Sequence, residues 1–494
     1  MKKMRILALA MALVMSASVF AGCSNNGGNT STGDGGNNTA DVPTVSWYTI
    51  GGTQPGNFDD VVATMSAYTE EQIGVKLKLY LNEWKVYKEK FQTMINGGDD
   101  FDIMFASSDY YSTFVNRGAF LDITEKVKEV TPEMEEFIPD NLWEGVQIGG
   151  KVYAVPTYKD SSMTQFWWYD DSLVQKYNLD IENAKTMDDL TEIFKTVKEG
   201  EGDAFYPVYL TQGNPWNGFW NDYDDLCSGL GGLVGVQIAD DTRKVVVPLE
   251  QEDMMHNMKL LHEWYQAGYI NPDANVSGDN YTKCFFGNGQ AWPSAAVGQA
   301  QSQGVAKYDY VKVSEPLYTS GTVQGSLNCI SKNSKNPDAA LKMLQLANLD
   351  RTFRDMLAYG KEGVDFNYVD KDNGVVKLEE SSSWTKGCAK YAQASFFNMS
   401  RLDTEPETQY DEIKAQNEEA ISSVCMGFVF DPTNVQSEIA TCNTIWSQSA
   451  KADLLTGAVD PEEKVPTLME ELRAAGLDTI IEEAQRQVDE FFAK

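Results

Sequence analysis

An alternation of short apolar runs and amphipathic stretches between residues 45 and 107 restricts this chain to an α/β fold. Apolar runs predict strands at 45–52, 75–81 and 101–107, and apolar residues at helical spacing predict helices over 58–73 and 83–95. Crossovers of this strand–helix–strand kind are right-handed, so the strands are expected to form a largely parallel sheet. Ligands of such sheets bind beyond the carboxyl ends of the strands.

Polar and aromatic side chains lie in or directly after the first and third of these strands. They are Trp47, Tyr48, Ser107, Ser108 and Asp109. Because the carboxyl ends of parallel strands share one edge of a sheet, we predict that these five residues lie on its ligand side.

The chain of 494 residues exceeds one ordinary domain and is long enough for two buried cores. Its 40 Lys and Arg residues against 73 Asp and Glu residues give a formal net charge of −33. Such an acidic surface repels phosphate groups, which argues against nucleic acid or anionic lipid as a partner. The charge indicates solubility and says little about the ligand.

The N-terminus has the pattern of an export signal. Residues 1–22 combine a basic start, an apolar run and a small Ala–Gly pair, which is typical of a secretory signal peptide. Residues 23–41 begin with Cys23 and continue as a Gly-, Asn-, Ser- and Thr-rich tether. The junction resembles the bacterial lipobox, in which the cysteine carries a diacylglycerol, although Phe20 departs from the aliphatic residue of that pattern. A lipid anchor on the outer face of the membrane is implied, with a plain signal peptide as the alternative.

Six further cysteines are widely spaced and form no C-x-x-C pair: Cys227, Cys284, Cys329, Cys388, Cys425 and Cys442. This spacing does not fit a zinc ribbon, and no metal site is predicted. Outside the cell these residues either form disulfides or remain buried thiols, and the sequence leaves both alternatives open.

Several stretches, in order along the chain, resemble family 1 extracellular solute-binding proteins, the maltose-binding-protein-like group. Residues 74–108, 118–127 and 148–157 resemble the N-terminal lobe of that family, and residues 169–199 and 472–492 resemble its subgroup of aldouronate- and complex-sugar-binding lipoproteins. The resemblance implies a periplasmic-binding-protein-like clamp, in which two α/β lobes joined by crossing hinge segments close on a ligand. It also implies an ABC importer with permease subunits as partners, no cofactor and no enzymatic activity. We expect a monomer.

The resemblance also implies how the chain is divided. The first lobe is expected to comprise residues 42–157 and about 297–350, and the second lobe residues 158–296 and about 351–494. Ala154 to Thr157 are expected to form the first hinge, and a second crossover is expected near residues 290–300.

A loop rich in Gly, Asn, Pro and aromatic residues follows an apolar strand in the stretch Pro207–Asp222. The matching loop of the maltose-binding-like fold supplies sugar contacts, which implies such roles for Gln212, Asn214, Trp216 and Trp220. Trp216 is expected to be a solvated platform, whose truncation lowers affinity and leaves the melting temperature almost unchanged. Packing in the core is an equally weighted alternative.

Four other candidates complete the predicted site: Tyr158, Asp160, Trp292 and Trp384. A sugar site needs flat aromatic faces for the rings and planar amides or carboxylates for the hydroxyl groups. If the sugar carries a uronate, a cation such as Lys159 or Arg401 is also needed. Solvated surface positions for the polar residues and core positions for the tryptophans are the alternatives.

Enzyme motifs are missing from the sequence. The two histidines, His256 and His262, are six residues apart and do not share a helix face, which argues against an H-E-x-x-H site or a histidine-based triad. The stretch Val369–Glu380 resembles a calcium loop, but Gly374 lies one place too early for an EF-hand, so a hairpin turn is predicted. The adjacent Trp167 and Trp168 are predicted on a strand, whose alternation directs one ring inward and one outward, so that at least one of them is a core residue.

The predicted function is therefore the lipid-anchored substrate-binding component of an ABC importer for an oligosaccharide, with or without a uronate. A receptor for peptides or another small solute is the first alternative. An anchored glycoside-active enzyme is the second, because the carboxylates are too numerous for a catalytic pair to be singled out or dismissed.

Overall fold

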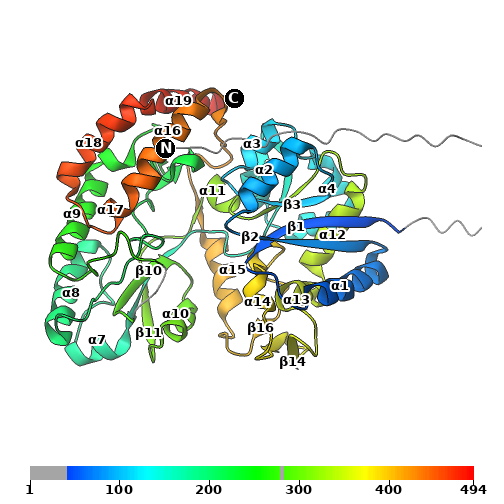
Figure 1. Ribbon diagram of the computed structural model, residues 1–494, viewed down its shortest axis with the longest axis horizontal. Helices are drawn as coiled ribbons and strands as arrows, with labels where there is room; N and C mark the ends of the chain where they lie inside the picture. The colour runs from blue at the N-terminus through cyan, green and yellow to red at the C-terminus, as the bar shows by residue number, and fades with distance from the viewer. Residues whose placement is uncertain (1–41, 279–282, 494) are drawn as a thin grey trace, which may run out of the picture. The chain divides into compact units, whose positions relative to one another are not determined.

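The computed structural model describes residues 42–278 and 283–493, which form two lobes (Figure 1). Each lobe has its own hydrophobic core. The first core draws on residues 45–158 and 318–394, and the second on residues 167–311 and 425–488. The predicted signal peptide, the linker 23–41 and Cys23 lie outside the described residues.

A five-stranded sheet with the order β2-β1-β3-β13-β6 forms the centre of the first lobe. β1 pairs in parallel with β2 and β3, whereas β13 pairs antiparallel with β3 and β6. The elements of this lobe are β1 (Thr44–Gly51), α1 (Phe58–Ile73), β2 (Lys76–Glu83), α2 (Tyr87–Gly97), β3 (Ile103–Ala106), α3 (Tyr111–Asn116), α4 (Thr124–Val130), α5 (Pro132–Phe137), α6 (Asp140–Gly145), β4 (Gln147–Ile148), β5 (Lys151–Val152), β6 (Ala154–Pro156), α11 (Ser320–Val323), β13 (Leu327–Ile330), α12 (Pro337–Leu349), α13 (Arg351–Tyr359), β14 (Phe366–Asp370), β15 (Val375–Leu378), α14 (Trp384–Gly387), β16 (Arg401–Leu402) and α15 (Gln409–Glu419).

The strand–helix order predicted for the start of the chain is confirmed by β1, α1, β2, α2 and β3. α1 buries Phe58, Val61, Met65 and Thr69, which lie on one face of the helix because they recur at helical spacing. Gly74 ends the helix with a φ of 66°, a left-handed conformation that glycine adopts without strain. The parallel strands therefore end at one edge of the sheet, as the sequence predicts.

The second lobe is built around a three-stranded antiparallel sheet with the order β10-β7-β11. Its C-terminal helices α16 to α19, drawn orange to red in Figure 1, pack together with α9. The elements of this lobe are β7 (Gln165–Asp170), α7 (Asp171–Tyr177), α8 (Met187–Glu201), β8 (Tyr223–Asp225), β9 (Gly235–Gln237), α9 (Glu252–Gln266), β10 (Phe286–Gln290), α10 (Ala295–Gln303), β11 (Tyr308–Lys312), α16 (Gln436–Ser449), α17 (Lys451–Leu455), α18 (Pro461–Ala474) and α19 (Leu477–Phe492).

The two adjacent tryptophans of the central strand β7 are both buried. Trp167 is 6 % exposed in the main core, and Trp168 is 9 % exposed in a smaller cluster with Ala296 and Ala300 of α10. The strand alternates as predicted, and the prediction that at least one of the two is a core residue is confirmed. The second ring is buried as well, because α10 covers the second face of the sheet.

The chain passes between the lobes near residues 157–164, 313–319 and 420–424. A backbone bridge joins Met163 to Leu317, and the short strand β12 (Leu317–Tyr318) pairs in parallel with β17 (Ile421–Ser422). Paired crossing segments of this kind are the expected place for a hinge.

These crossings differ from the predicted hinges and lobe boundaries. Ala154–Pro156 is strand β6 of the first sheet and pairs with β13, so it belongs to the lobe itself. Residues 297–312 lie in the second lobe, where β11 pairs with β7. The predicted assignment of residues 351–419 to the second lobe is also wrong, because α13 and α14 pack into the first core and α15 packs against α13 through a smaller cluster. Local sequence carries no signal for these long-range contacts.

Three further features bear on the sequence predictions. All six described cysteines are buried and free. The hairpin predicted around Gly374 is confirmed by β14 and β15, which pair antiparallel on either side of it. Over residues 42–278 and 283–493, no helix is long and apolar enough to cross a bilayer, and no group of three His, Cys, Asp or Glu side chains is placed to hold a metal ion.

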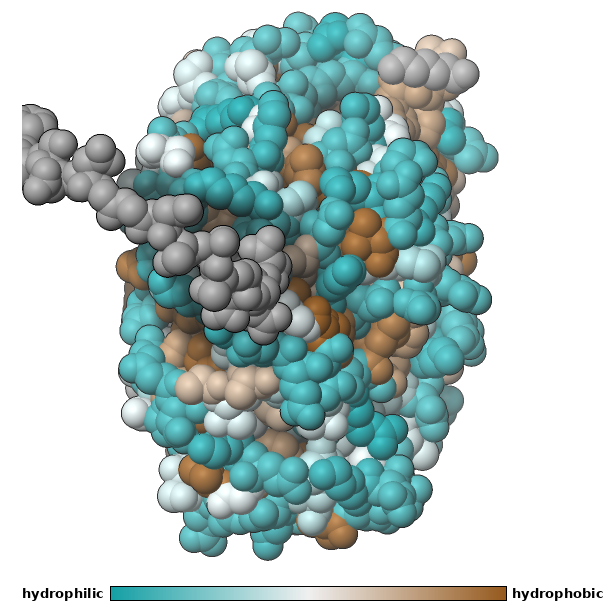
Figure 2. Space-filling model, turned by 90° about the vertical axis from the view of Figure 1, so that its right-hand side faces the viewer, coloured by the Kyte–Doolittle hydropathy of each residue, from teal (hydrophilic) through white to brown (hydrophobic). Residues whose placement is uncertain are grey.

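Figure 2 views the molecule from the side of the first lobe. Hydrophilic residues cover most of this face, and apolar residues are scattered among them. Scattered apolar residues are normal on protein surfaces. The apolar residues visible on this face therefore do not by themselves mark a binding site.

Candidate ligand-binding site

The loop that follows Leu210 in the second lobe is fixed by hydrogen bonds to distant parts of the chain. The Asn271 carboxamide accepts a bond from the Leu210 backbone nitrogen at 2.8 Å and donates one to the Leu210 carbonyl at 3.0 Å. Further along, the backbone nitrogen of Trp216 donates to the carbonyl of Leu455 at 2.9 Å. The loop therefore holds its side chains in place although it contains no helix or strand.

Trp216 is the buried anchor of this loop. Its side chain is 3 % exposed, and its ring stacks on Phe286 with centroids 5.6 Å apart and 8° between the planes. Its centroid also lies 5.3 Å from that of Trp264. The prediction that Trp216 is a solvated platform is wrong, because the loop folds back onto β10 and α9.

A cavity of about 550 Å³ lies beside this loop, and we call it the main cavity. Side chains from β7, the loop and α17 line it, among them Gln165, Gln212, Asn217, Trp220, Asn221 and Lys451. Carboxamides both donate and accept hydrogen bonds, as sugar hydroxyl groups require, and indole rings cover the apolar faces of sugar rings. Three of the predicted residues, Gln212, Trp216 and Trp220, are therefore brought together here.

The indole of Trp220 is held firmly at this cavity. Its Nε1 donates to the carbonyl of Gly232 at 2.6 Å. Gly232 has a φ of 93°, and a Cβ at this position would lie 2.1 Å from that nitrogen, so only glycine fits beneath the ring. Lys451 Nζ lies 5.8 Å from the ring centroid, and burial lowers the pKa of Lys451 while Asp225 opposes this shift. A fixed aromatic ring loses little conformational freedom when a ligand binds.

The first lobe supplies a second aromatic surface at the carboxyl end of β2. Trp84 directly follows this strand and is 42 % exposed. Its ring stacks on Tyr391, with centroids 5.9 Å apart and 18° between the planes. The sequence analysis missed both residues. Trp84 follows the second strand of the sheet, and the rule that ligands bind beyond strand ends points to it as well.

Ser107, Ser108 and Asp109 follow β3 at the same edge of the sheet. Asp109 is exposed and forms an ion pair with Lys88 at 3.8 Å, and it lines a cavity of about 250 Å³. Their position at the edge is as predicted, and a role in ligand binding stays a prediction.

Two predicted contacts are instead buried tryptophans of the first lobe. Trp47 is 0 % exposed, and its Nε1 donates to Asn328 Oδ1 at 3.0 Å. Trp384 is also 0 % exposed and stacks on Phe58, with centroids 5.6 Å apart. Their predicted binding roles are wrong, because each ring is surrounded by protein and each fills a core position.

Two predicted tyrosines are packed as well. Tyr48 lies within β1 and stacks on Tyr80 with centroids 4.3 Å apart, and burial together with Tyr80 raises its pKa to about 12. Tyr158 is 5 % exposed and packs on Phe397, with ring centroids 4.3 Å apart. The predicted role of Tyr158 as a ligand contact is therefore wrong, because its ring is packed in the first lobe. Tyr48 is only partly buried, and its role in ligand binding stays a prediction.

The remaining predicted residues line other cavities. Asp160 and Trp292 meet in a cavity of about 350 Å³ beside the first crossing segment. There Asp160 pairs with Lys159 at 3.0 Å, and the Nε1 of Trp292 is buried without a partner in the described chain. Asn214 lines a cavity of about 370 Å³ next to the main cavity. The predicted site is thus divided among several cavities.

Two α/β lobes with crossing segments and a cavity lined by carboxamides and indoles define a solute-binding protein. The chain belongs to the family of bacterial extracellular solute-binding proteins, whose model matches residues 51–350, more than half of its length. Residues 424–493 match a domain of unknown function, DUF3502. Membership in this family makes the chain an extracellular binding protein and not an enzyme.

Its relatives include a carbohydrate ABC transporter substrate-binding protein from Streptococcus pneumoniae serotype 4 (strain ATCC BAA-334 / TIGR4), which is 29% identical over 503 residues that cover 99% of each chain. The crystal structure of the N-glycan transport solute binding protein NgtS from Streptococcus pneumoniae matches with a TM-score of 0.80 and 26% identity, covering 92% of this chain and 99% of that chain. The complex of NgtS with Man5GlcNAc matches with a TM-score of 0.71 and 26% identity, covering 91% and 98%.

Proposed function

We propose that the chain is the carbohydrate-binding subunit of an ABC importer and that it binds a neutral oligosaccharide. The observation that carries this proposal is the main cavity, whose lining combines uncharged carboxamides with Trp216 and Trp220. The carbohydrate relative and the complexes of NgtS with Man1GlcNAc and with Man5GlcNAc support it. The Trp84–Tyr391 pair of the first lobe offers a further aromatic face for a sugar ring.

A neutral sugar is favoured over a uronate because the two predicted cations are already paired with carboxylates of the protein. Lys159 is paired with Asp160 at 3.0 Å and Arg401 with Glu407 at 3.2 Å, and the two basic side chains are only 15% and 18% exposed. A bound uronate needs a cation that is available to its carboxylate. Lys451 is the cation at the main cavity, so a uronate-bearing sugar is the second candidate and depends on that residue.

Calorimetric titration tests the function with Man5GlcNAc, a uronate oligosaccharide and a tripeptide. We expect heat of binding with Man5GlcNAc and no release of reducing ends in the same samples. Trp84→Ala should lower this affinity by roughly 10- to 100-fold, as loss of an exposed aromatic contact does. The matched control is Val86→Ala, since Val86 is 50 % exposed and lies two residues away. Binding of the peptide alone, or equal losses in both variants, contradicts the proposal.

We also propose that Cys23 carries a lipid anchor that keeps the receptor close to its permease. Cys23→Ala should move the protein from the membrane fraction to the medium and leave sugar affinity unchanged, because acyl chains supply the membrane affinity of such proteins. Ser24→Ala is the control and should stay with the membranes. Sedimentation of the Cys23→Ala protein with membranes after a salt wash would show that the anchor lies elsewhere.

A further inference from the structure

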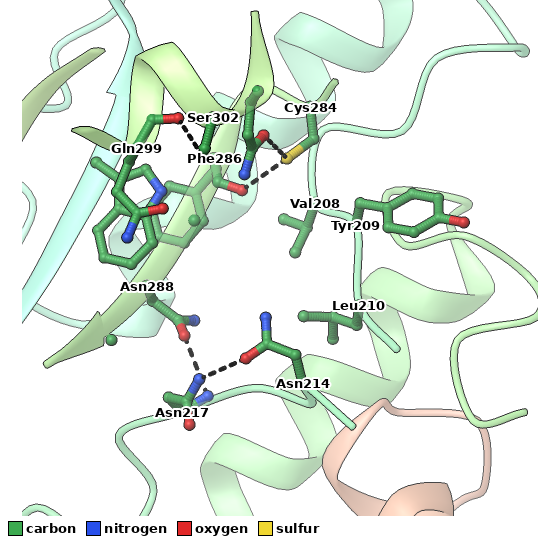
Figure 3. Close-up of a pocket in the computed structure, with 14 residues that line it drawn as sticks. Val208, Tyr209, Leu210, Asn214, Asn217, Cys284, Phe286, Asn288, Gln299 and Ser302 are labelled. Atoms are coloured by element: carbon green, nitrogen blue, oxygen red, sulfur yellow. Dashed lines mark hydrogen bonds between the residues drawn. The ribbon is translucent and has the colours of Figure 1, made fainter. Parts of the chain in front are cut away.

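A cavity of about 370 Å³ opens in the second lobe next to the main cavity, and we call it the side cavity (Figure 3). Its walls come from residues 208–217, β10 and α10, and Asn217 lines both cavities. The volume is within the range of roughly 300–1,000 Å³ typical of small-molecule sites. The described residues that line it carry no charged side chain. A ligand of the side cavity is therefore expected to be neutral.

Two carboxamides of the side cavity have their oxygens already engaged. The backbone nitrogen of Asn217 donates to Asn288 Oδ1 at 3.1 Å, so the Asn288 Nδ2 remains, and Figure 3 shows this carboxamide beside the open space. On α10, Gln303 Oε1 accepts from the Tyr308 hydroxyl at 2.8 Å, which leaves the Gln303 Nε2 for a ligand. The cavity therefore offers amide donors from two walls to an oxygen-rich ligand.

The edge strand β10 adds backbone groups. The backbone nitrogen of Phe286 donates to the Pro207 carbonyl at 2.9 Å, away from β7. Alternate residues of a strand direct their backbone groups the same way, so Asn288 also turns its N–H and C=O outward. A Cβ on the neighbouring Gly287 would lie 2.3 Å from Trp168 Nε1, so this strand carries no side chain there. A ligand can approach the bare backbone closely.

Apolar side chains form the opposite wall. Figure 3 shows Val208 and Leu210 directed toward the open space and Tyr209 turned away from it. A pyranose ring has apolar C–H faces and a rim of hydroxyl groups. It would place one face on Val208 and Leu210 and its hydroxyl groups at Asn288 and Gln303.

We propose that the side cavity binds one neutral pyranose unit of an oligosaccharide whose main part lies in the main cavity. This unit would branch or bend away from the rest of the sugar beside Asn217, which lines both cavities. This inference rests on the proposed sugar-binding function. The side cavity would select branched oligosaccharides over short linear ones, because a disaccharide in the main cavity leaves it empty.

The test fills the side cavity from α10. Ser302 is exposed and lines the cavity, so Ser302→Phe places a ring in the space without touching the main cavity. The neighbouring Gln301 is exposed and is not part of the lining, which makes Gln301→Phe the matched control. We expect calorimetry of Ser302→Phe to show an affinity for Man5GlcNAc that is lower by at least about tenfold, and an unchanged affinity for Man1GlcNAc.

Asn288→Asp gives an independent second variant. The aspartate keeps an oxygen that accepts from the Asn217 backbone nitrogen, but it lacks the amide donor. It should therefore lower the affinity for Man5GlcNAc as Ser302→Phe does, and leave the melting temperature unchanged. An unaltered affinity for Man5GlcNAc in both variants overturns the proposed role of the side cavity. An equal loss of affinity for Man5GlcNAc and Man1GlcNAc overturns it as well. If the unmodified protein binds neither sugar, the proposed function itself fails, and the branch site fails with it.

Discussion

Trp216→Ala is expected to lower the free energy of unfolding by about 3–5 kcal/mol, the range for removing a large aromatic side chain from a core. The ring is 3 % exposed and is enclosed by Phe286 and Trp264, so its loss leaves a cavity that the anchored loop cannot fill. Chemical denaturation followed by far-ultraviolet circular dichroism measures the change.

The control for this experiment is a tryptophan in a different environment. Trp84 is 42 % exposed, so Trp84→Ala should lower the free energy of unfolding by less than Trp216→Ala does, while it weakens sugar binding. An unchanged unfolding midpoint for Trp216→Ala would show that the loop is open in solution and that the ring is solvated. Sugar affinity of the folded Trp216→Ala protein should fall as well, because the ring supports one wall of the main cavity.

The architecture of the first lobe was predictable because the signals for it are local. α1 shows apolar residues at helical spacing and ends at a glycine, and β3 is an apolar run without interruption. The division of the chain was not predictable in the same way. α13 and α14 return to the first core through contacts with residues far back in the sequence, such as the stacking of Trp384 on Phe58.

The tryptophans show why the site was predicted only in part. Trp384 stands in a stretch of polar residues, which favours an exposed position, yet it is 0 % exposed. Trp84 has no unusual neighbours and is the one that lies open at a strand end. Burial of a large ring depends on which distant segment covers it, and the residues next to the ring in the sequence do not indicate that segment.

The polar part of the site was recognised by residue type rather than by place. Gln212 is implied by the resemblance of its loop to the sugar-contacting loop of the maltose-binding-like fold. Gln165 lies in a buried strand and Lys451 begins a helix near the C-terminus, so neither carries a local mark of binding. They meet at the main cavity because β7 and α17 pack into one lobe.

Asp224→Asn should stabilise the protein, and more strongly at pH 8 than at pH 5. Asp224 is 3 % exposed in β8, and its Oδ2 has no hydrogen-bond partner in the described chain. Burial, aided by the negative charge of Asp225, raises the pKa of Asp224 from 3.8 to about 7. Between about pH 4 and pH 7 the carboxyl of Asp224 is therefore protonated in the folded protein and ionised in the unfolded chain.

The sign of the pH dependence follows from this difference. Stability from the protonated carboxyl is fully present below pH 3.8, is lost as the pH rises, and is gone above about pH 7. At about 1.4 kcal/mol per pKa unit, the full loss is roughly 4 kcal/mol, of which roughly 3 kcal/mol falls between pH 5 and pH 8. Asparagine has the same shape and no charge, so the variant should not show this loss.

Urea unfolding of both proteins at pH 5 and pH 8 measures the effect. Asp241→Asn is the matched control, because Asp241 is an exposed carboxylate of the same lobe and its replacement should give nearly equal changes at the two pH values. A gain for Asp224→Asn that is the same at both pH values would mean that Asp224 is ionised in the folded protein throughout this range. The carboxylate would then have to be reached by water or by a cation, and β8 would have to be less tightly packed than its burial indicates.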